Sequence, residues 1–408
     1  MPVCPRLARL SAVVLILLIA SSPTFAASKH HAPPDPSLPW DTFGFGLNDV
    51  RTDSMWLDKV PAAAPTSDDD VPATACAYSR STKDCLVPLA PISLHPAATV
   101  LNYGQSLFEG LKAFRRADGS IALFRPERNA RRMMEGANRL LLPPVDEETF
   151  VAAADAVVRS NARFVPPTGK GALYLRPLLF GSGEGLGVKP SSESTFCIYC
   201  SPVGNYFKGG LRAISLQAVE GYSRAAPGGS GGIKAGGNYA PPFRVQREVR
   251  SRGYDEALFL DARHGEAIEE AGASNFFAVF PNNTIVTPPL DTGTILPGVT
   301  RASLIELARK ECNCQVYERR ITIDDLEGAC EAFCCGTGAS ITPVGRVNYL
   351  PSESGSSSRR PAKDFVFGDG ENAGAISRKL YKLLLDIQMG NDEALAEKYA
   401  DWIHIVQS

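Results

Sequence analysis

The chain has 408 residues, of which 44% are hydrophobic and 21% are charged, and its formal net charge at pH 7 is −2. This length and apolar content predict a globular protein with one very large domain or two domains of ordinary size. The nearly balanced charge gives no argument for a nucleic-acid partner or for a partner at a membrane surface.

Residues 1–27 have the layout of a signal peptide and are excluded from the fold. Arg6 and Arg9 precede an apolar run over residues 10–20, and small residues suited to cleavage follow at 24–26. The run is too short for a comfortable membrane span, so no membrane association is expected once the leader is removed. Residues 28–39 are rich in proline and are expected to be a disordered linker.

Between residues 40 and 202, strand-like and helix-like runs alternate, and we expect a small N-terminal domain. Asp118-Gly119 lies between two short apolar runs, which predicts a β-hairpin. Pro126 and an apolar face at helical spacing, which includes Met133 and Ala137, predict a helix over 126–142. The other predicted elements are a strand beginning at Cys85, a helical turn near 100 that enters a strand, a helix over 147–161, and strands at 171–180 and 194–200.

Turn residues at 202–210 separate two strand-like runs and mark the best domain boundary. We therefore expect an interdomain loop at 203–211 and a larger domain at 212–408. Within the larger domain, the predicted elements are strands at 255–260, 267–270, 275–280 and 284–287, helices at 300–310 and 376–387, and an exposed loop at 352–360.

A glycine-rich stretch, Gly228 to Ala240, contains one lysine, Lys234, and one tyrosine, Tyr239. Glycines let a ligand or another backbone approach closely, so the stretch predicts a shaped pocket, although flexible linkers are also rich in glycine. A phosphate-binding P-loop is excluded, because it needs glycine directly before the lysine and serine or threonine directly after it. A lysine in a tight, partly apolar site has a lowered pKa and a nucleophilic amine, which suits Schiff-base chemistry.

The Lys234 segment resembles the lysine motif of branched-chain aminotransferases, in the class IV pyridoxal-phosphate (PLP) group. That group also contains D-amino-acid aminotransferase and aminodeoxychorismate lyase. The resemblance covers roughly residues 38–408, and the start near Trp40 is similar to that of the plant-type enzymes. It implies the α+β, two-domain fold type IV, with a small α/β N-terminal domain and a larger pseudo-barrel α/β C-terminal domain that binds PLP.

The resemblance implies that Lys234 bonds covalently to PLP and that Glu270 pairs with its pyridine nitrogen. Glu270 matches the glutamate of the family motif ExGxxN[LF]F in its spacing to a glycine and to Asn275, whereas Glu269 does not. The alternative is a solvated strand end for both glutamates, with Asn275 as a turn residue. Tyr239 is the expected partner of the cofactor's ring oxygen, and its alternative role is simple packing beside the glycines.

The resemblance also places the cofactor phosphate. Arg132 is its expected partner, since a cation suits a dianion, but other arginines crowd the same region and the choice rests on the motif. The family uses the backbone amides of Val299 and Thr300 at a helix start, where N–H groups and the helix dipole attract anions. Thr300 is in addition a candidate N-cap. Thr337 adds a hydroxyl, and Ala273 completes the expected cofactor contacts.

The substrate pocket implied by the resemblance is walled by the small domain and closed by one turn of the large domain. The wall residues are Tyr103, Phe108, Gly110, Tyr174 and Arg176, and the turn offers backbone amides of Gly338 and Ala339 to the substrate carboxylate. Aromatic walls discriminate poorly by one methyl group, which is consistent with leucine, isoleucine and valine sharing one enzyme. Taken singly, such aromatic residues fit a hydrophobic core equally well.

The ten cysteines do not form a small-domain disulfide framework. Cys197 and Cys200 make one CxxC in a strand-like run, where buried thiols are common. No second pair stands at a zinc spacing, and His30-His31 lacks further ligands, so no metal is expected. Animal members of the family carry a redox CxxC directly after the Gly-Thr. Ala339 and Thr342 occupy those positions here.

The resemblance therefore implies an enzyme, expected to be a homodimer, that exchanges the amino group between branched-chain amino acids and 2-oxoglutarate, with 2-oxo acids and glutamate as the other substrates. Another class IV enzyme is the alternative. A secreted, non-catalytic descendant is a remote alternative suggested only by the leader. The leader favours a plastid reached through the endoplasmic reticulum, and the secretory pathway or the mitochondrion are the other candidates.

Overall fold

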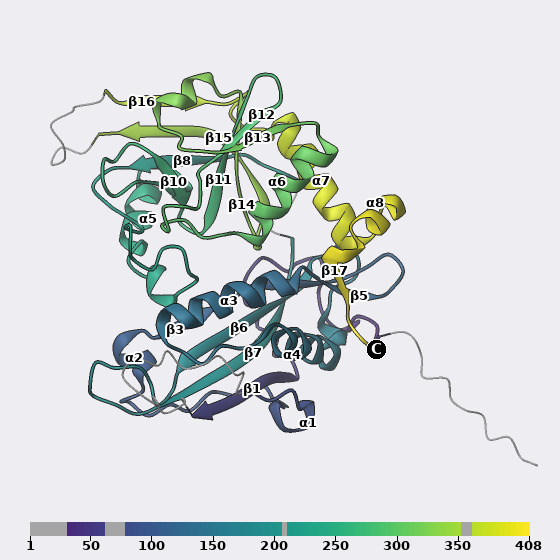
Figure 1. Cartoon of the computed structure of the whole chain (residues 1–408). Coiled ribbons are helices and arrows are strands. Elements are labelled where there is room, and N and C mark those ends of the chain that lie inside the picture. The colour runs from purple at the N-terminus through teal and green to yellow at the C-terminus, as the bar shows by residue number, and fades with distance from the viewer. Residues whose placement is uncertain (1–30, 62–77, 206–209, 352–360) are drawn as a thin grey trace, which may run out of the picture.

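The computed structural model describes residues 31–61, 78–205, 210–351 and 361–408, which form two sheet-containing bodies stacked on each other (Figure 1). The leader and the loop predicted at 352–360 lie outside the described residues. Residues 31–39, expected to belong to a disordered linker, instead contact the first body: the Asp35 N–H donates to the Arg163 carbonyl at 2.9 Å, and the two side chains pair at 3.2 Å. No helix in the described part of the chain is long and apolar enough to cross a membrane.

The first body is built on an antiparallel sheet of eight strands in the order β17-β5-β4-β6-β7-β1-β2, with β3 paired to β6. Helices α3 and α4 contact each other, and α4 contacts strands β1 and β7. The strands are β1 (Ser54–Pro61), β2 (Leu86–Pro88), β3 (Ser106–Phe108), β4 (Leu111–Arg115), β5 (Ile121–Phe124), β6 (Ala172–Gly181), β7 (Glu193–Val203) and β17 (Ile403–Ile405). The helices are α1 (Thr82–Cys85), α2 (Thr99–Tyr103), α3 (Pro126–Leu140) and α4 (Glu147–Ser160), followed by the 3-10 segment η1 (Ala162–Phe164).

Local sequence signals account for most of this body. The predicted hairpin is confirmed, since β4 and β5 pair around the turn that holds Asp118 and Gly119. Helix α3 begins at Pro126 and ends where Leu141 adopts a positive φ of 53°. Its buried face includes Met133 and Ala137, as the apolar spacing predicts.

The second body contains a nine-stranded sheet in the order β10-β9-β8-β15-β14-β11-β12-β13, with β16 paired to β15. Because β10 also pairs with β11, six of these strands close into a ring, which confirms the predicted pseudo-barrel. The strands are β8 (Ile214–Val219), β9 (Glu256–Leu260), β10 (Ile268–Ala271), β11 (Ser274–Phe280), β12 (Thr284–Thr287), β13 (Gln315–Glu318), β14 (Glu331–Gly336), β15 (Ser340–Leu350) and β16 (Lys363–Val366). The helices are α5 (Phe243–Ser251), α6 (Val299–Glu311), α7 (Ala375–Met389) and α8 (Glu393–Lys398), with 3-10 segments η2 (Gly236–Asn238), η3 (Asp324–Gly328) and η4 (Ala400–Trp402).

The predicted elements of the second body are present, but one detail is wrong. The N-cap of α6 is Gly298 and not Thr300, so the helix begins at Val299. A side chain does not fit at position 298, because its Cβ would collide with the side-chain oxygen of Asn275. The close approach of the Asn275 side chain to the Gly298 backbone therefore determines which residue precedes this helix, and the preference of threonine for the N-cap position does not.

The end of the chain returns to the first body. Strand β17 pairs with β5, and the ring centroids of Trp402 and Phe124 lie 5.8 Å apart. The guanidinium of Arg125 stacks over the Trp402 ring at 4.0 Å. The pairing of β17 with β5 shows that the last strand of the chain completes the first sheet. The division into domains at residues 40–202 and 212–408 stays a prediction.

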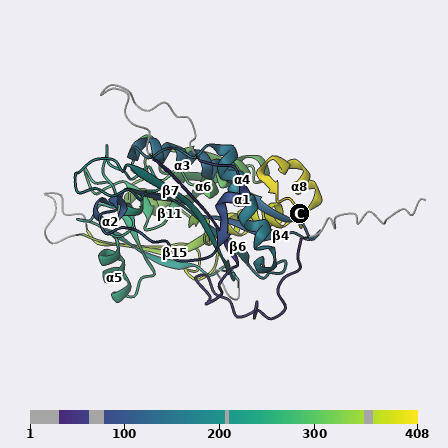
Figure 2. The same cartoon turned by 90° about the horizontal axis from the view of Figure 1, so that it is seen from below.

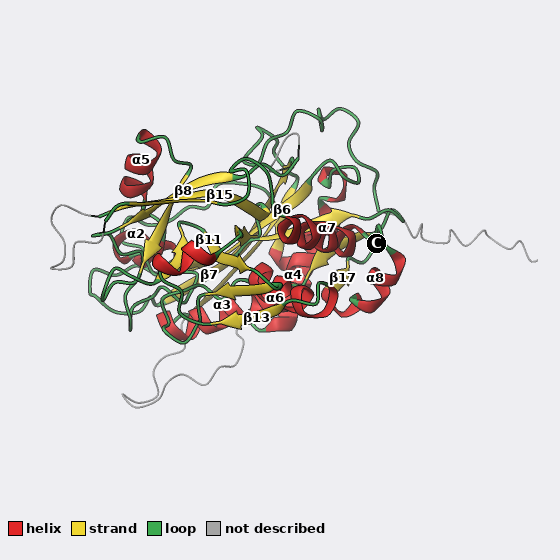
Figure 3. Cartoon of the chain, turned by 90° about the horizontal axis from the view of Figure 1, so that it is seen from above, coloured by secondary structure: helices red, strands yellow, loops and turns green. Residues whose placement is uncertain are grey.

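The lysine-bearing stretch lies where the two bodies meet. The N–H of Phe108 on β3 donates to the carbonyl of Lys234 at 3.1 Å, and Leu107 forms an isolated β-bridge with Ala235. Seen from below, β6 and β7 of the first body run across the second body (Figure 2). Seen from above, α5 stands apart from the other large helices (Figure 3). The two sheets thus hold this stretch between them.

Candidate active site

Lys234 lies in an aromatic and cationic environment at the junction of the two bodies. Its Nζ donates to the hydroxyl of Tyr239 at 3.1 Å and lies 4.6 Å from the centre of the Phe108 ring. Burial, together with the nearby charge of Arg132, lowers the pKa of Lys234 to about 7. About half of the amine is therefore neutral near pH 7, and the neutral form is the one that acts as a nucleophile or a base.

Tyr239 connects the lysine to the aromatic wall. Its ring packs edge-on against Phe108, with the centroids 4.7 Å apart. Burial, and then the carboxylate of Glu270, raise the pKa of Tyr239 to about 12, so its hydroxyl keeps its proton and can donate to an acceptor. The structure thus brings Lys234, Tyr239 and Phe108 together, as the sequence predicts.

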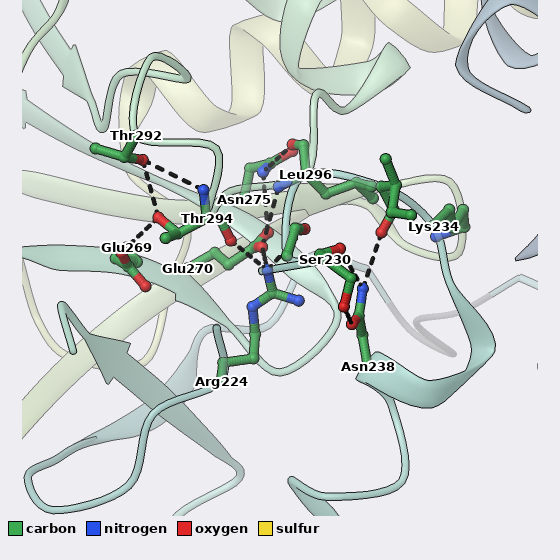
Figure 4. Close-up of polar contacts among 12 residues, drawn as sticks. Arg224, Ser230, Lys234, Asn238, Glu269, Glu270, Asn275, Thr292, Thr294 and Leu296 are labelled. Carbon is green, nitrogen blue, oxygen red and sulfur yellow. Dashed lines mark hydrogen bonds and ion pairs between the residues drawn. The ribbon is translucent and has the colours of Figure 1, made fainter. Parts of the chain in front are cut away.

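Glu270 on β10 is buried and fully hydrogen-bonded (Figure 4). One carboxylate oxygen lies 2.5 Å from the Arg224 guanidinium and accepts from the Leu296 N–H at 3.1 Å. The other accepts from the side-chain amide of Asn275 at 3.1 Å. Burial raises the pKa of Glu270 to about 7, and the charge of Arg224 opposes that rise. The predicted alternative of a solvated strand end is wrong for this residue, and Asn275 lies in β11 and not in a turn.

Glu269, the neighbouring carboxylate, faces elsewhere. Adjacent residues of a strand point to opposite sides, and Glu269 accepts from the Thr294 hydroxyl at 2.5 Å (Figure 4). Arg224 is the functional candidate that sequence reasoning missed. It also donates to the carbonyls of Gly231 and Thr294, at 3.2 and 2.6 Å. Its position ten residues before Lys234 gives no local signal, since only the fold brings it to Glu270.

Arg132 is held at the start of helix α6 by a buried carboxylate. Its guanidinium makes two hydrogen bonds of 2.7 Å with Glu109, which is completely buried, and donates to the Pro297 carbonyl at 2.9 Å. Burial alone raises the pKa of Glu109, but the charge and hydrogen bonds of Arg132 more than offset it and lower that pKa. These three hydrogen bonds leave two of the five guanidinium N–H groups of Arg132 free for an anion.

Two of the predicted phosphate contacts, Val299 and Thr300, closely follow Pro297, whose carbonyl accepts from Arg132. Val299 and Thr300 are the first two residues of α6, and the first four N–H groups of a helix have no partner within it. Thr337 lies in the turn that joins β14 to β15, and the adjacent Gly336 is close to the carbonyl oxygen of Ala273. A guanidinium, a helix N-terminus and a hydroxyl-bearing turn are groups that bind phosphate.

Four of the predicted pocket residues form one connected cluster on the first sheet. A side chain at Gly110 would collide with the Tyr174 hydroxyl, so glycine is required there. Arg176 donates to that hydroxyl at 3.2 Å and stacks over the Phe108 ring at 4.9 Å. Phe45, which the sequence analysis did not single out, packs edge-on against Tyr174 with the centroids 5.7 Å apart.

The predicted carboxylate turn faces this cluster, whereas Tyr103 lies apart from it. The carbonyl of Gly338 accepts from the Lys112 ammonium at 2.6 Å, and Ala339 is the last residue of the same turn. Tyr103, at the end of α2, is exposed and donates to the Leu186 carbonyl at 2.5 Å. Among the described residues, no ring contact or hydrogen bond joins Tyr103 to the Lys234 cluster within one chain.

Cys197, Cys200 and two surface cavities lie outside this cluster. Burial raises the pKa of Cys197 and of Cys200 to about 12. No group of three potential metal ligands occurs in the part of the chain that the structure describes. A cavity of about 420 Å³ lies between β8 and α5, and one of about 430 Å³ lies beside α4, and neither is lined by a predicted site residue.

Comparison with known proteins yields one consistent set of relatives. Residues 106–347 match the model of the amino-transferase class IV family. The chain is 43% identical to the chloroplastic branched-chain-amino-acid aminotransferase 5 of Arabidopsis thaliana, over 90% of this chain and 79% of the relative. It is 42% identical to the branched-chain-amino-acid aminotransferase of Helicobacter pylori, over 78% of this chain and 88% of the relative. The crystal structure of the branched-chain amino acid aminotransferase from Escherichia coli superposes with a TM-score of 0.65 at 26% identity, over 88% of this chain and all of that one.

Proposed function

The chain belongs to the class IV aminotransferases and, within them, to the branched-chain-amino-acid aminotransferases, and from that premise we propose that it exchanges the amino group between leucine, isoleucine or valine and 2-oxoglutarate. The cofactor is pyridoxal 5'-phosphate. The observation that carries the proposal is the convergence of Lys234, an amine whose pKa is lowered to about 7, with the buried carboxylate of Glu270 and the anion-binding group at Arg132.

The residues present fit PLP group by group. Lys234 is placed to bind the aldehyde, and Tyr239 to donate to the ring oxygen beside it. Glu270 is the carboxylate for the pyridine nitrogen, while Arg132 and the N-terminus of α6 are the donors for the phosphate. When bound, PLP supplies an electron sink for the carbanion that forms at the substrate Cα.

The protein's own contribution is proton transfer and orientation. In the half-reaction of the amino acid, the Nζ of Lys234 would take the proton from the substrate Cα as a general base and deliver it as a general acid to C4′, the aldehyde carbon of the bound cofactor. The half-reaction of the 2-oxo acid would run the same transfer in reverse, and both directions require a pKa near the working pH. Glu270 holds a negative charge in a buried place, where it stabilises a protonated ring nitrogen. Tyr239 keeps its proton and orients the lysine by their hydrogen bond.

The substrate is held by the cluster on the first sheet. Phe108 and Tyr174 offer apolar ring faces to a branched side chain, and Phe45 extends this wall. The Arg176 guanidinium supplies a positive charge beside the same wall, which suits the second carboxylate of glutamate and 2-oxoglutarate. The amides of the turn at Gly338 and Ala339 are the proposed donors to the α-carboxylate.

Another class IV enzyme, acting on D-amino acids or on aminodeoxychorismate, is the competing function. The relatives named as branched-chain enzymes match most of the chain, which favours the first proposal. Mixing the PLP-loaded protein with L-leucine should change its visible spectrum, and mixing it with D-alanine should not. The reverse result would favour the D-amino-acid enzyme.

We also propose a homodimer in which an exposed apolar face around α2 is covered by the second copy. Leu101 and Tyr103 on α2 and Leu186 and Val188 on the adjoining loop are all large apolar or aromatic side chains left exposed in the single chain. Such a patch marks an interaction site more often than a free surface. Sedimentation of the purified protein should give twice the mass of one chain, and a monomer with full activity would contradict the assignment.

For localisation we propose a plastid, reached by way of the leader at residues 1–27. Plant relatives named as chloroplastic and as mitochondrial both match the chain, which supports an organelle but not one compartment over the other. Fusing residues 1–40 to a fluorescent protein tests the proposal. Fluorescence in mitochondria, or secretion of the fusion, would contradict it.

The decisive experiment replaces Lys234 by alanine. Loss of the base and of the covalent bond should lower the rate of glutamate formation from L-leucine and 2-oxoglutarate by about 10³-fold or more. Lys310→Ala is the matched control, because Lys310 is exposed on helix α6 and its ammonium pairs with Glu306 at 2.7 Å. A Lys234→Ala protein with more than about a tenth of the wild-type rate would refute the assigned role.

A further inference from the structure

Lys112 lies on the pocket-facing side of the first sheet. It is the second residue of β4 and pairs directly with Tyr174 across the antiparallel ladder. Directly opposed residues of two strands point to the same face of the sheet, and so do residues two apart on one strand. Lys112 therefore shares its face with Gly110, Tyr174 and Arg176, three residues of the proposed substrate pocket.

The ammonium of Lys112 carries a positive charge without a nearby carboxylate. Its contacts are the Gly338 carbonyl at 2.6 Å and the Phe45 ring, whose centre lies 5.5 Å away. In the described part of the chain no ion pair involves this lysine, whereas the two buried cations closest to the cofactor groups, Arg132 and Arg224, each pair with a glutamate. Burial lowers the pKa of Lys112 to about 8. A buried cation that has no ion-pair partner is stabilised when an anion binds beside it.

The hydrogen bond to Gly338 fixes the orientation of one peptide group. The unit that joins Gly338 to Ala339 is planar and trans, so its N–H points away from the side on which its carbonyl meets Lys112. A cation bonded to the carbonyl also polarises the unit, which makes the N–H of Ala339 a stronger donor to an anion. The turn of Gly338 and Ala339 is the proposed binding place of the α-carboxylate.

From this arrangement we propose that Lys112 is the counter-charge of the substrate α-carboxylate and acts through the Gly338–Ala339 peptide as a positioning residue. The inference rests on the proposed function. It assigns different roles to Arg176 and Lys112, the two cations of the proposed substrate pocket. Arg176 lies beside the aromatic wall that receives the side chain. Lys112 lies behind the turn that receives the α-carboxylate common to all the substrates.

Three variants of the PLP-loaded enzyme distinguish the effect of the Lys112 charge from the effect of its hydrogen bond to the Gly338 carbonyl. Lys112→Gln keeps a donor for the carbonyl and removes the charge, Lys112→Arg keeps the charge, and Lys112→Met removes both. Retention of PLP and the melting temperature show whether each variant folds. The probes are 4-methylvaleric acid, a carboxylate without an amine, and its uncharged amide, each tested as a competitive inhibitor of L-leucine.

We expect the acid to bind Lys112→Gln about tenfold or more weakly than wild type, the amide to bind both alike, and Lys112→Arg to behave as wild type. Equal weakening of acid and amide would overturn the proposal, because Lys112 would then only support the turn. Weaker binding of 2-oxoglutarate with unchanged binding of the acid would also overturn it and assign Lys112 to the second carboxylate. A wild-type protein that fails to transaminate L-leucine would instead reject the proposed function on which the inference rests.

Discussion

The guanidinium of Arg224 and the carboxylate of Glu270 form an ion pair 2.5 Å long, and both side chains are almost completely buried. Arg224 approaches from the loop after β8, and Glu270 from β10. A buried carboxylate keeps its charge only if a nearby cation and hydrogen bonds compensate for lost solvation. Arg224, Leu296 and Asn275 supply that compensation for Glu270.

Replacing Arg224 by methionine should destabilise the cofactor-free protein in a pH-dependent way. Without its partner, Glu270 has a folded-state pKa still higher than about 7, well above the unfolded value. The folded state then binds more protons than the unfolded state, so stability falls as pH rises through that range. Denaturation should show a loss that is about 1 kcal/mol larger near pH 8 than near pH 5.

Arg250→Met is the control for that experiment, because Arg250 is exposed and lies 3.7 Å from Glu256. Its effect should be below about 0.5 kcal/mol at either pH. A loss for Arg224→Met that does not grow with pH would show that the arginine packs the loop without controlling the charge of Glu270.

Replacing Lys234 by methionine should stabilise the cofactor-free protein at neutral and acidic pH. The pKa of Lys234 is lowered to about 7 in the folded state, so below pH 7 folding must bury a charged ammonium. That penalty disappears as pH rises from about 7 to the unfolded value near 10.5. The gain in unfolding free energy, about 1–3 kcal/mol at pH 6, should therefore vanish near pH 10. A gain that is independent of pH would contradict this charge-burial account.

Replacing Glu109 by glutamine should destabilise the cofactor-free protein and weaken PLP binding. Glu109 holds Arg132 by two hydrogen bonds of 2.7 Å, and without it the buried guanidinium has no carboxylate partner. The guanidinium is then also no longer fixed where the phosphate is proposed to bind. We expect a loss of about 3 kcal/mol for the free protein, measured by denaturation, and about tenfold weaker PLP binding.

Glu147→Gln is the matched control, because its partner Arg131 is the neighbour of Arg132 on helix α3. Glu147 pairs with Arg131 at 2.6 Å, but the arginine of this pair is more than half exposed. Such a pair contributes about 0–1 kcal/mol. Similar losses for both variants would show that burial of the Glu109–Arg132 pair has no special consequence.

Replacing Gly110 by alanine should raise the KM for leucine by about tenfold with little change in PLP binding. The added Cβ would collide with the Tyr174 hydroxyl, and Tyr174 must then move out of the pocket wall. Gly237→Ala is the control, since its Cβ would meet no atom within 4 Å. An unchanged KM for Gly110→Ala would exclude Tyr174 from the substrate wall.

Mild alkylation of the native protein should label Cys330 and spare the other described cysteines. Cys330 is exposed, whereas Cys85, Cys197, Cys200, Cys312, Cys314, Cys334 and Cys335 are buried. Buried thiols have raised pKa values and present little reactive thiolate. Mass spectrometry after iodoacetamide treatment checks this. Labelling of Cys197 or Cys200 at the rate of Cys330 would indicate an accessible redox pair.

Local patterns predicted much of the secondary structure. The hairpin at Asp118-Gly119 and the helices over 126–142 and 147–161 are confirmed within two residues, because their signals lie within one turn or one helix face. Strands β13 to β16 were not predicted. Strand β13 pairs with β12 across the whole of helix α6, and short apolar runs do not reveal such a partner. Strands β14 and β15 form a hairpin around residues 337–339, and β16 pairs with β15.

The sequence by itself determined which groups are available: an amine at Lys234, a carboxylate at Glu270 with its glycine and asparagine spacing, and a helix start near Thr300. Only the tertiary structure decided that Arg224 meets Glu270, that Glu109 holds Arg132, and that β10 closes the ring with β11. The physical reason is that burial and ion pairing depend on contacts between segments tens of residues apart. Composition and spacing within one segment do not contain those contacts.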